Sequence, residues 1–140
     1  MCGIIGINSN KEVTSTILNS LRKLEYRGYD SAGIATLNSG YIQEVKCEGR
    51  VDNLEKNIIK NKLLGNVGIG HVRWATHGIP STLNAHPHSS ENVSVVHNGI
   101  IENSTLLKKF LVKKGHRFKS QTDTEAVSYT HLRAHETVVY

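Results

Sequence analysis

The order of the elements predicted from the sequence indicates a layered protein of the mixed α/β or α+β class. Two observations lead to this prediction. Short apolar runs closed by turn residues alternate along the chain with segments in which apolar residues recur at helical spacing. The chain has 140 residues, the size of one ordinary domain, and its 38% hydrophobic residues and 2 prolines exclude disordered and collagen-like chains.

The amino-terminal part of the chain predicts a strand followed by a helix. Residues 2–7 form an apolar run that ends in a turn at residues 8–10, which is typical of a buried strand. A helix is expected next, because four apolar residues recur at helical spacing: Val13, Ile17, Leu21 and Leu24. We expect this helix to stop near Arg27 and Gly28, with the glycine supplying a left-handed cap.

The next part of the chain predicts a hairpin, a second helix and a strand. Residues 32–37 and 41–47 are the expected hairpin strands, because the turn signal Asn38-Ser39-Gly40 lies between them. Residues 51–63 predict a weaker helix. A glycine-rich segment then leads into a strand that reaches Trp74.

The last part of the chain predicts a long loop, a strand and a helix. No clear periodicity is present between Trp74 and Asn92, and so long an irregular loop inside a compact domain is usually functional. Residues 93–97 alternate as a strand. A helix is expected from Glu102 onward, with lysines outside and an inner face made by four apolar residues: Leu106, Leu107, Phe110 and Leu111.

Charge, hydropathy and cysteine content exclude several classes of protein. Lys and Arg number 17 against 12 Asp and Glu, a net charge of +5, but the basic residues within 108–119 are spaced like the solvated face of a helix. We therefore expect no nucleic-acid binding. No apolar run approaches the roughly 20 residues that cross a bilayer, and the start lacks a signal peptide, so we expect a cytoplasmic protein without membrane association. Cys2 and Cys47 are too few for a disulfide framework.

Histidines mark the region where a functional site is expected. Five of the 8 histidines lie between residues 71 and 97: His71, His77, His86, His88 and His97. One interpretation is a metal site that includes His86, His88 and Cys2, although their spacing matches none of the usual zinc patterns. The other two are a set of hydrogen-bonded loop histidines and a pocket that recognises a small polar molecule.

Cys2 follows a methionine that can be trimmed because the next side chain is small. As the mature amino terminus, Cys2 carries a thiol and an α-amino group on one residue. The amine has an ordinary pKa of about 7.7 to 8.0, so it can accept the thiol proton and later pass one to a leaving amine. The alternative is a small buried residue in the first strand, the commoner place for a single cysteine.

Four further residues suit the binding of an amide-bearing amino acid. The Asn98 side-chain amide and the Gly99 N–H can both point at one oxyanion, where each donor typically contributes about 3 kcal/mol. An ordinary Asn-Gly turn is the alternative. Arg73 suits a substrate carboxylate and Asp123 suits a substrate ammonium, although an aspartate is also typical of a helix N-terminus.

Six motifs together resemble those of one enzyme family. They are Met1-Cys2-Gly3-Ile4-Ile5-Gly6, Glu25-Tyr26-Arg27-Gly28-Tyr29-Asp30-Ser31-Ala32-Gly33, His71-Val72-Arg73-Trp74-Ala75-Thr76-His77-Gly78, Asn84-Ala85-His86-Pro87-His88, Val96-His97-Asn98-Gly99-Ile100-Ile101-Glu102-Asn103 and Thr122-Asp123-Thr124-Glu125. Over residues 1–125 the chain resembles the amino-terminal glutaminase domain of the glucosamine-6-phosphate synthases, the isomerizing glutamine:fructose-6-phosphate aminotransferases. The related amidophosphoribosyltransferases share the Cys2 start and the region of Asn98 and Gly99, and they are the alternative within this class.

The resemblance implies the N-terminal nucleophile hydrolase fold, a four-layer α/β/β/α sandwich of the α+β class. It also implies hydrolysis of glutamine by Cys2 after Met1 has been removed. Cys2 attacks the carboxamide while its own amine shuttles the proton, and Asn98 and Gly99 hold the oxyanion. Ammonia then leaves behind a glutamyl thioester that water clears.

The same resemblance implies a role for each remaining site residue. Arg73 and Asp123 hold the carboxylate and the ammonium of glutamine, and Arg27 belongs to a loop that closes on the site. Trp74 lies at the ammonia exit. Three residues surround the substrate: Thr76, His77 and His86.

In the whole enzymes of this family, ammonia passes to an isomerase domain that converts fructose 6-phosphate to glucosamine 6-phosphate without a metal or an organic cofactor. The resemblance therefore implies glutamine as the ligand of this chain. It implies fructose 6-phosphate as a ligand of a separate domain, a homodimeric parent enzyme, and no metal ligand among these residues.

We expect residues 1–125 to be a partial glutaminase domain and residues 126–140 to be an atypical tail. The tail departs from the apolar helix expected after Glu125, and its residues 128–137 resemble a string found at the ends of unrelated translated assemblies. We therefore expect an assembly artefact there. Sequencing the source transcript across codon 126 tests this, and native sequence that reads through to Tyr140 would contradict it.

The 140-residue chain expressed alone is expected to be poorly folded and to hydrolyse little or no glutamine. The reason is that a sandwich without its later strands and covering helices leaves apolar faces exposed. Thermal unfolding followed by circular dichroism, together with a glutaminase assay, measures both properties. A cooperative transition accompanied by turnover of glutamine would contradict the expectation.

Overall fold

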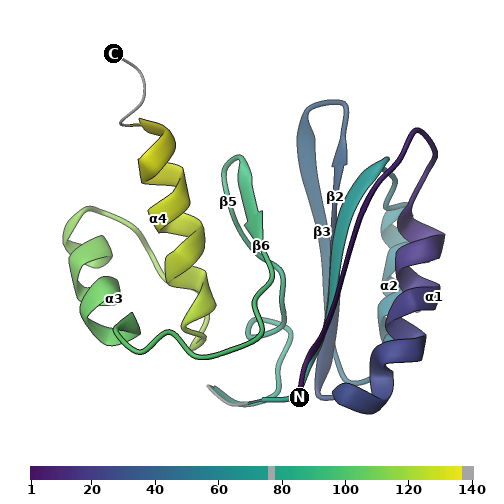
Figure 1. The fold of residues 1–140 in the computed structure, drawn as a ribbon, viewed down its shortest axis with the longest axis horizontal. Coiled ribbons are helices and arrows are strands. Elements are labelled where there is room, and N and C mark those ends of the chain that lie inside the picture. Colours follow the sequence, from purple (N-terminus) through teal and green to yellow (C-terminus); the bar gives the residue numbers. More distant parts are fainter. Residues whose placement is uncertain (76–77, 137–140) are drawn as a thin grey trace.

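The computed structural model describes residues 1–75 and 78–136, which form four layers side by side (Figure 1). Helices form the two outer layers, and two β-sheets lie between them. The helices are α1 (Thr14–Leu24) and α2 (Val51–Asn61) on one side, and α3 (Ser104–Lys113) and α4 (Thr124–Glu136) on the other. This arrangement confirms the expected α+β class and the α/β/β/α order of the layers.

The larger sheet brings the amino terminus beside the end of a strand that is distant in sequence. Its four antiparallel strands are, in spatial order, β1 (Gly3–Asn8), β4 (Val67–Arg73), β2 (Ser31–Asn38) and β3 (Tyr41–Glu48). Gly3 of β1 lies opposite Val72 of β4. Cys2, which precedes β1, therefore lies next to the residues at which β4 ends.

Strands β2 and β3 form the predicted hairpin. Ser39 and Gly40 connect them, and φ is positive at both residues, 52° and 81°. Positive φ at both central residues is what a two-residue turn needs to match the twist of the strands. The turn signal in the sequence is thereby confirmed.

The main core lies between the larger sheet and helices α1 and α2. Its buried side chains come from both helices and from the sheet face toward them, and they include Ile17, Leu21, Ile34, Leu54 and Val72. Glycines 68 and 70 of β4 lie directly under α1, because a Cβ atom at either position would be 2.6 Å from the Ile17 side chain. Side chains there would push α1 away from the sheet.

The expected left-handed cap at Gly28 is wrong. Helix α1 ends at Leu24 and a 3-10 turn (Glu25–Arg27) follows it, while Gly28 has an extended φ of 179°. A Cβ atom at Gly28 would be 2.5 Å from the carbonyl carbon of Arg73. Glycine is required here because two backbone segments pass close together, and not because of a helix end.

The smaller sheet consists of β5 (His88–Ser90) and β6 (Val93–Val95), which are antiparallel. Strand β5 lies inside the segment expected to be irregular up to Asn92, so that part of the prediction is wrong. A three-residue strand is too short for its period to be recognised in sequence. The predicted strand over residues 93–97 is confirmed but ends two residues earlier.

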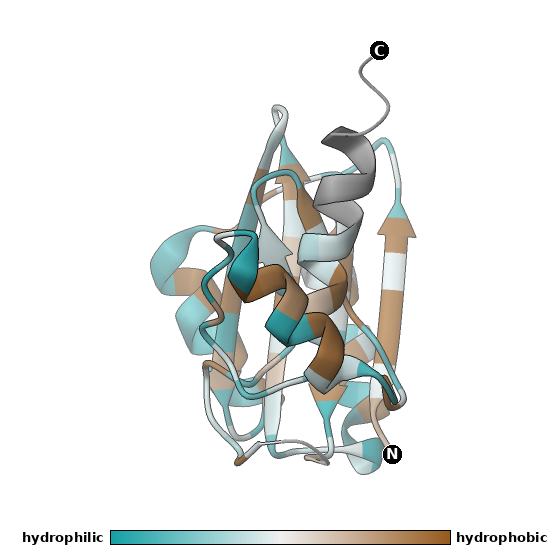
Figure 2. Ribbon diagram, turned by 90° about the vertical axis from the view of Figure 1, so that its left-hand side faces the viewer, coloured by the Kyte–Doolittle hydropathy of each residue, from teal (hydrophilic) through white to brown (hydrophobic). Residues whose placement is uncertain are grey.

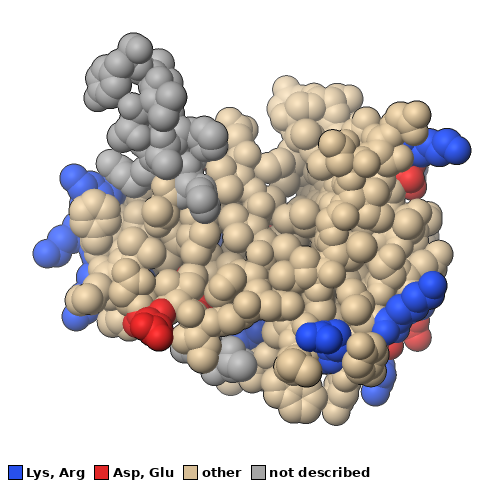
Figure 3. Space-filling model, in the orientation of Figure 1, with Lys and Arg blue, Asp and Glu red and all other residues tan. Residues whose placement is uncertain are grey.

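The predicted inner face of α3 is only partly buried. Leu111 is buried, but Leu106 and Phe110 are 70% and 51% exposed. Helix α3 packs against α4, and the side of it that carries Leu106 and Phe110 is exposed in the described part of the chain. Figure 2, which looks toward α3, shows brown apolar segments on this outer helix. Figure 3 shows basic side chains along the outer margin of the same end of the molecule.

Helix α4 carries the chain into the segment that was expected to be an atypical tail. Ala126 and Ser128 are buried, and the helix continues to Glu136. Residues 137–140 of that segment lie outside the described residues. Within the ranges that the structure describes, no helix is long and apolar enough to cross a membrane.

Three buried histidines lie between the two sheets. The rings of His71 and His86 are stacked with their centroids 4.2 Å apart, and the ring of His88 meets that of His86 edge-on at 4.7 Å. Burial lowers the pKa of His71 to about 4 and the pKa of His88 to about 3. The pKa of His86 is also lowered, by burial and by the neighbouring His71 and His88. All three rings are therefore neutral at pH 7.

Gly33 of β2 lets the segment that carries two of these histidines approach the larger sheet. A Cβ atom at Gly33 would be 2.1 Å from the carbonyl oxygen of His86. The next residue, Pro87, accepts a hydrogen bond of 3.1 Å from the partly buried Lys46 ammonium of β3. The segment is thus held against the larger sheet by a close contact and by a charged donor.

Gly33→Ala is expected to lower the free energy of unfolding by about 1 to 3 kcal/mol, because backbone must move to make room for the methyl group. The measurement uses a chimera: a full-length enzyme of the family that the sequence resembles, in which residues 1–125 of this chain replace the matching segment. Amide hydrogen exchange of β2 and β4 reports the stability of this region. Gly6→Ala is the matched control, since its Cβ atom would have no neighbour closer than 3.9 Å. Equal effects of the two substitutions would contradict the packing argument.

The three neutral histidines are expected to make stability depend on pH. In the unfolded chain the pKa of each histidine is about 6.5. In the folded chain it is about 4 for His71 and about 3 for His88. At pH values between the folded and the unfolded pKa, the unfolded state therefore binds more protons than the folded state. Their contribution is complete above pH 6.5 and is lost as the pH falls toward 4. Hydrogen exchange of β4 in the chimera, corrected for intrinsic rates, measures the free energy of opening. This free energy is expected to fall by up to about 1.4 kcal/mol per pH unit for each histidine. His88→Gln should reduce the dependence of this free energy on pH by the amount that corresponds to about one proton. An unchanged dependence would contradict the conclusion that His88 is neutral in the folded protein.

Candidate active site

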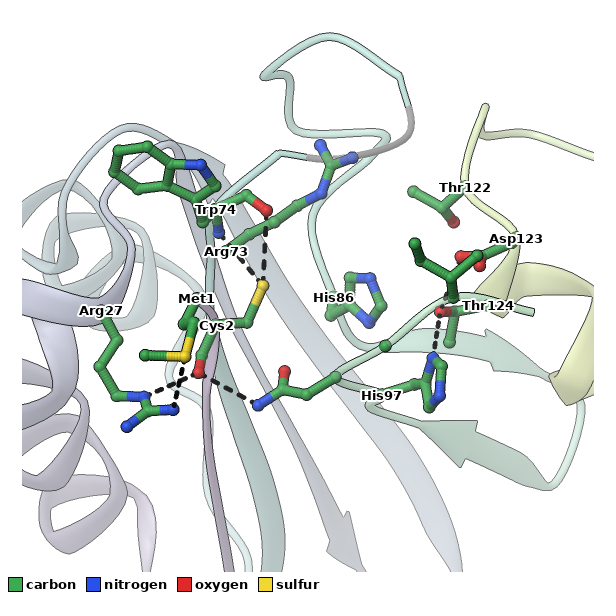
Figure 4. A pocket seen from close by; sticks show the side chains of 13 residues that line it. Met1, Cys2, Arg27, Arg73, Trp74, His86, His97, Thr122, Asp123 and Thr124 are labelled. Carbon is green, nitrogen blue, oxygen red and sulfur yellow. Dashed lines mark hydrogen bonds between the residues drawn. The ribbon is translucent and has the colours of Figure 1, made fainter. Parts of the chain in front are cut away.

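A cavity of about 440 Å³ opens where the ends of the two sheets meet (Figure 4). Its size is within the range of small-molecule sites. Eight of the ten residues predicted for the site line it: Cys2, Arg27, Arg73, Trp74, His86, Asn98, Gly99 and Asp123. Thr76 and His77, the other two, lie outside the described residues.

Cys2 is fixed at one wall of the cavity by hydrogen bonds to its thiol and to its carbonyl group. Its Sγ atom accepts a hydrogen bond from the Trp74 N–H at 3.2 Å and lies 3.5 Å from the Trp74 carbonyl oxygen. Its own carbonyl oxygen accepts hydrogen bonds from Arg27 Nε at 2.9 Å and from Asn98 Nδ2 at 3.1 Å. The thiol is thus held at the end of β4 while remaining partly accessible.

The second cysteine has a different environment. Cys47 belongs to β3 and its side chain lies in the main core, where burial raises the pKa of the thiol to about 11. A thiol with so high a pKa is a poor nucleophile at neutral pH. Cys2 is therefore the thiol that is available for chemistry in the described part of the chain.

Asn98 and Gly99 follow β6 and line the cavity together with Cys2, whose carbonyl oxygen accepts a hydrogen bond from Asn98 Nδ2. Gly99 has a φ of 146°, a conformation that side chains rarely adopt. The Asn98 side chain is held by His71 Nε2 at 3.0 Å and by the Cys2 carbonyl. This pair joins a strand to a loop before α3 and does not connect two strands, so it is not the ordinary hairpin turn considered above.

Arg73 and Asp123 bring opposite charges to the cavity. Arg73 ends β4, is 3% exposed, and donates to the carbonyl oxygens of Ile79 at 3.3 Å and Gly78 at 3.4 Å. Burial lowers the pKa of its guanidinium, and the charges of Cys2, Asp30 and Asp123 act in the opposite direction. Asp123 precedes α4, and its carboxylate accepts a 2.7 Å hydrogen bond from the Ile101 N–H.

A pair of side-chain amides joins the loops that carry these two charges. Asn84 Oδ1 accepts a 2.7 Å hydrogen bond from the Gln121 N–H, and Asn84 Nδ2 donates to Gln121 Oε1 at 3.0 Å. Asn84 Nδ2 also donates to the Ile79 carbonyl at 2.9 Å, the same carbonyl that Arg73 contacts. These part-buried hydrogen bonds therefore connect the segment next to Arg73 with the segment next to Asp123.

Trp74 and Arg27 stand at the rim. Trp74 is 45% exposed, and its ring meets that of Tyr29 edge-on, with the centroids 5.9 Å apart. Arg27 lies in the turn after α1 and contacts the Met1 thioether at 3.9 Å in addition to the Cys2 carbonyl. Both positions fit side chains that border an opening.

Sequence reasoning assigned no role to five further residues that line the cavity, although His97 was among the histidines that marked the region: Met1, His97, Ile100, Thr122 and Thr124. The signal for Thr122 and Thr124 was present, because both flank Asp123 within one motif. It also missed the contact of His71 with Asn98, although His71 was among the histidines that marked the region. Among the described residues, no group of three or more His, Cys, Asp or Glu side chains is arranged to hold a metal ion.

Curated proteins with similar sequences are named as one enzyme. The chain is 58% identical over 129 residues to a glutamine--fructose-6-phosphate aminotransferase [isomerizing] of Clostridium acetobutylicum, covering 91% of this chain and 21% of that enzyme. It is 51% identical over 134 residues to the enzyme of the same name from Bartonella henselae, covering 96% of this chain and 22% of that enzyme. The chain thus spans about a fifth of the length of these curated relatives.

Solved structures share the fold. A glutamine phosphoribosylpyrophosphate amidotransferase from B. subtilis, complexed with ADP and GMP, has 29% identity and a TM-score of 0.77, covering 92% of this chain and 28% of its own. A structure described as the allosteric regulatory enzyme of purine biosynthesis has 30% identity and a TM-score of 0.76, covering 92% of this chain and 29% of its own. These similarities confirm the N-terminal nucleophile hydrolase fold expected from the resemblance.

A family profile described as the glutamine amidotransferase domain matches residues 55–139, more than half of the chain. The match includes Arg73, the pair Asn98 and Gly99, and Asp123, all of which line the cavity. The chain belongs to the glutamine amidotransferase domain family.

Proposed function

We propose that the cavity hydrolyses the carboxamide of glutamine, with Cys2 as the nucleophile. The observation that carries this proposal is that Cys2, Asn98 and Gly99 line one cavity, with Asn98 Nδ2 3.1 Å from the Cys2 carbonyl oxygen. A thiol beside convergent N–H donors is what acyl transfer requires, since one group forms the new bond and the others stabilise the oxyanion. Removal of Met1 completes the site, because it converts the Cys2 nitrogen into an amine.

The proposed reaction has two halves. The Cys2 amine takes the thiol proton, the thiolate attacks the carboxamide carbon, and the oxyanion is held by Asn98 Nδ2 and the Gly99 N–H. The proton then passes to the substrate nitrogen, the C–N bond breaks, and ammonia leaves a glutamyl thioester on Cys2. Water, with its proton taken by the amine, breaks the C–S bond, releases glutamate and restores the thiol.

The two charged side chains fit the other end of glutamine. Arg73 would bind the α-carboxylate with its planar donors, and Asp123 would bind the α-ammonium. The hydrogen bonds between Asn84 and Gln121 connect the segments that carry these two charges, which supports a fixed spacing between them. Thr76, His77 and His86 are proposed to surround the substrate, Trp74 to border the ammonia exit, and Arg27 to belong to a loop that closes on Cys2.

We propose that this chain is the amino-terminal part of a longer enzyme, an isomerizing glutamine--fructose-6-phosphate aminotransferase, and that the longer enzyme is homodimeric and cytoplasmic. The support is the identity of 51 to 58% to relatives of that name. A reducing compartment also suits a reaction that needs the Cys2 thiol. Fructose 6-phosphate would bind outside this chain and receive the ammonia, with no cofactor.

An amidophosphoribosyltransferase has weaker support, since the solved structure of that kind is 29% identical. Downstream sequence of the source gene decides between the two acceptors.

In the chimera built on the Clostridium acetobutylicum relative, we expect loss of Met1, turnover of glutamine, and one equivalent of a glutamine-like electrophile on Cys2. Intact mass and peptide mapping measure the first and the third. Asn98→Ala is expected to lower kcat about 10²- to 10³-fold, the usual cost of one oxyanion donor. Cys2→Ala should abolish both turnover and labelling, because no other described thiol lines the cavity.

Cys47→Ala provides the control for the thiol, since Cys47 is buried in the core and should leave labelling intact. An unsubstituted chimera that folds but neither hydrolyses glutamine nor reacts at Cys2 would overturn the proposed function. So would labelling that persists after Cys2→Ala and disappears after Cys47→Ala.

A further inference from the structure

The Asn98 carboxamide is held at both of its ends. Its Nδ2 atom lies 3.1 Å from the Cys2 carbonyl oxygen, and its Oδ1 atom lies 3.0 Å from His71 Nε2. An amide held at only one end can turn about its last side-chain bond. Two partners of fixed position leave the Asn98 amide a single orientation, in which one Nδ2 hydrogen remains for the cavity.

The chemistry of the two partners fixes the proton on His71. The Cys2 carbonyl can only accept a hydrogen bond, so Asn98 must present its NH₂ group there. Asn98 Oδ1 is then the atom facing His71, and it too can only accept. His71 Nε2 must therefore carry the single proton of the neutral ring and donate it to Asn98 Oδ1.

His71 is itself rigidly placed. It lies on β4, an inner strand with neighbours on both sides, opposite Ile4 of β1 and Gly33 of β2. Its side chain is completely buried, and its ring stacks on that of His86 with centroids 4.2 Å apart. Burial keeps the ring neutral at pH 7. The donor that faces Asn98 is thus carried by a strand that is paired on both sides.

We propose that His71 is a positioning residue, which uses its Nε2 proton to hold the Asn98 carboxamide in the orientation that donates to the oxyanion. This inference rests on the proposed glutaminase function. His71 does not line the cavity, so it acts through Asn98 and not on the substrate. Without it, Asn98 can turn its oxygen toward the cavity, where an oxygen repels the developing negative charge.

A double-mutant cycle in the same chimera tests this positioning role. His71→Phe keeps a flat ring but removes the donor, and it is expected to lower kcat for glutamine hydrolysis about 10- to 100-fold with KM changed less than about 3-fold. In the Asn98→Ala background the same substitution is expected to change kcat less than about 2-fold, because the amide to be positioned is gone. His71→Gln, which places an N–H donor near the same point, should restore kcat to within about 3-fold of the unsubstituted chimera.

His88→Phe is the matched control. It removes an equally buried ring from the same cluster but has no contact with Asn98, so its effect should be the same with and without Asn98→Ala. Effects of His71→Phe that multiply with those of Asn98→Ala would overturn the positioning role while the glutaminase function stands. A His71→Gln variant as slow as Asn98→Ala would also overturn it, and it does so even if His71→Phe fails to fold. Absence of hydrolysis by the unsubstituted, folded chimera overturns both proposals.

Discussion

The pairing of β1 with β4 is the interaction on which the rest of the site depends. It places the second residue of the chain against residues 73 and 74, which are more than 70 positions away. A residue next to a chain terminus is ordinarily mobile unless its segment is tied into a sheet. Here six consecutive residues of β1 pair with β4, so the segment that carries Cys2 is tied into the sheet. Precise placement of a nucleophile on a terminus follows from this pairing.

The same strand organises the electrostatics of the cavity. Residues 71 and 73 of β4 both project to the side away from α1 and α2, since they alternate with the glycine and valine that face those helices. One of them is a buried neutral imidazole and the other a buried guanidinium. A neutral ring leaves Arg73 as the cation at this end of the strand, beside the Cys2 thiol. The sheet therefore presents a hydrogen-bond donor and a positive charge at two neighbouring points.

Much of the fold could be predicted from sequence because its signals are local. The apolar run of β1, the spacing of Ile17 and Leu21, and the turn at Ser39 and Gly40 each depend on a few adjacent residues. The misjudged parts depend on contacts across the molecule. Strand β5 is too short to have a period, and Leu106 of α3 is exposed because nothing in the described chain covers that side of the helix. Local pattern gives amphipathic character but not the partner.

The candidate site also combines features that local sequence signals predict with features that depend on contacts across the molecule. Its residues were found through motifs, yet two motif glycines serve the architecture and not the chemistry. Gly28 lets the turn after α1 pass the Arg73 backbone, and Gly33 lets the His86 carbonyl lie on the sheet. Neither lines the cavity. The contact between His71 and Asn98 is the reverse case, in which a residue outside the cavity is bonded to one inside it. Membership of a motif therefore does not separate groups that meet the substrate from groups that hold them, and only the geometry of the folded chain does.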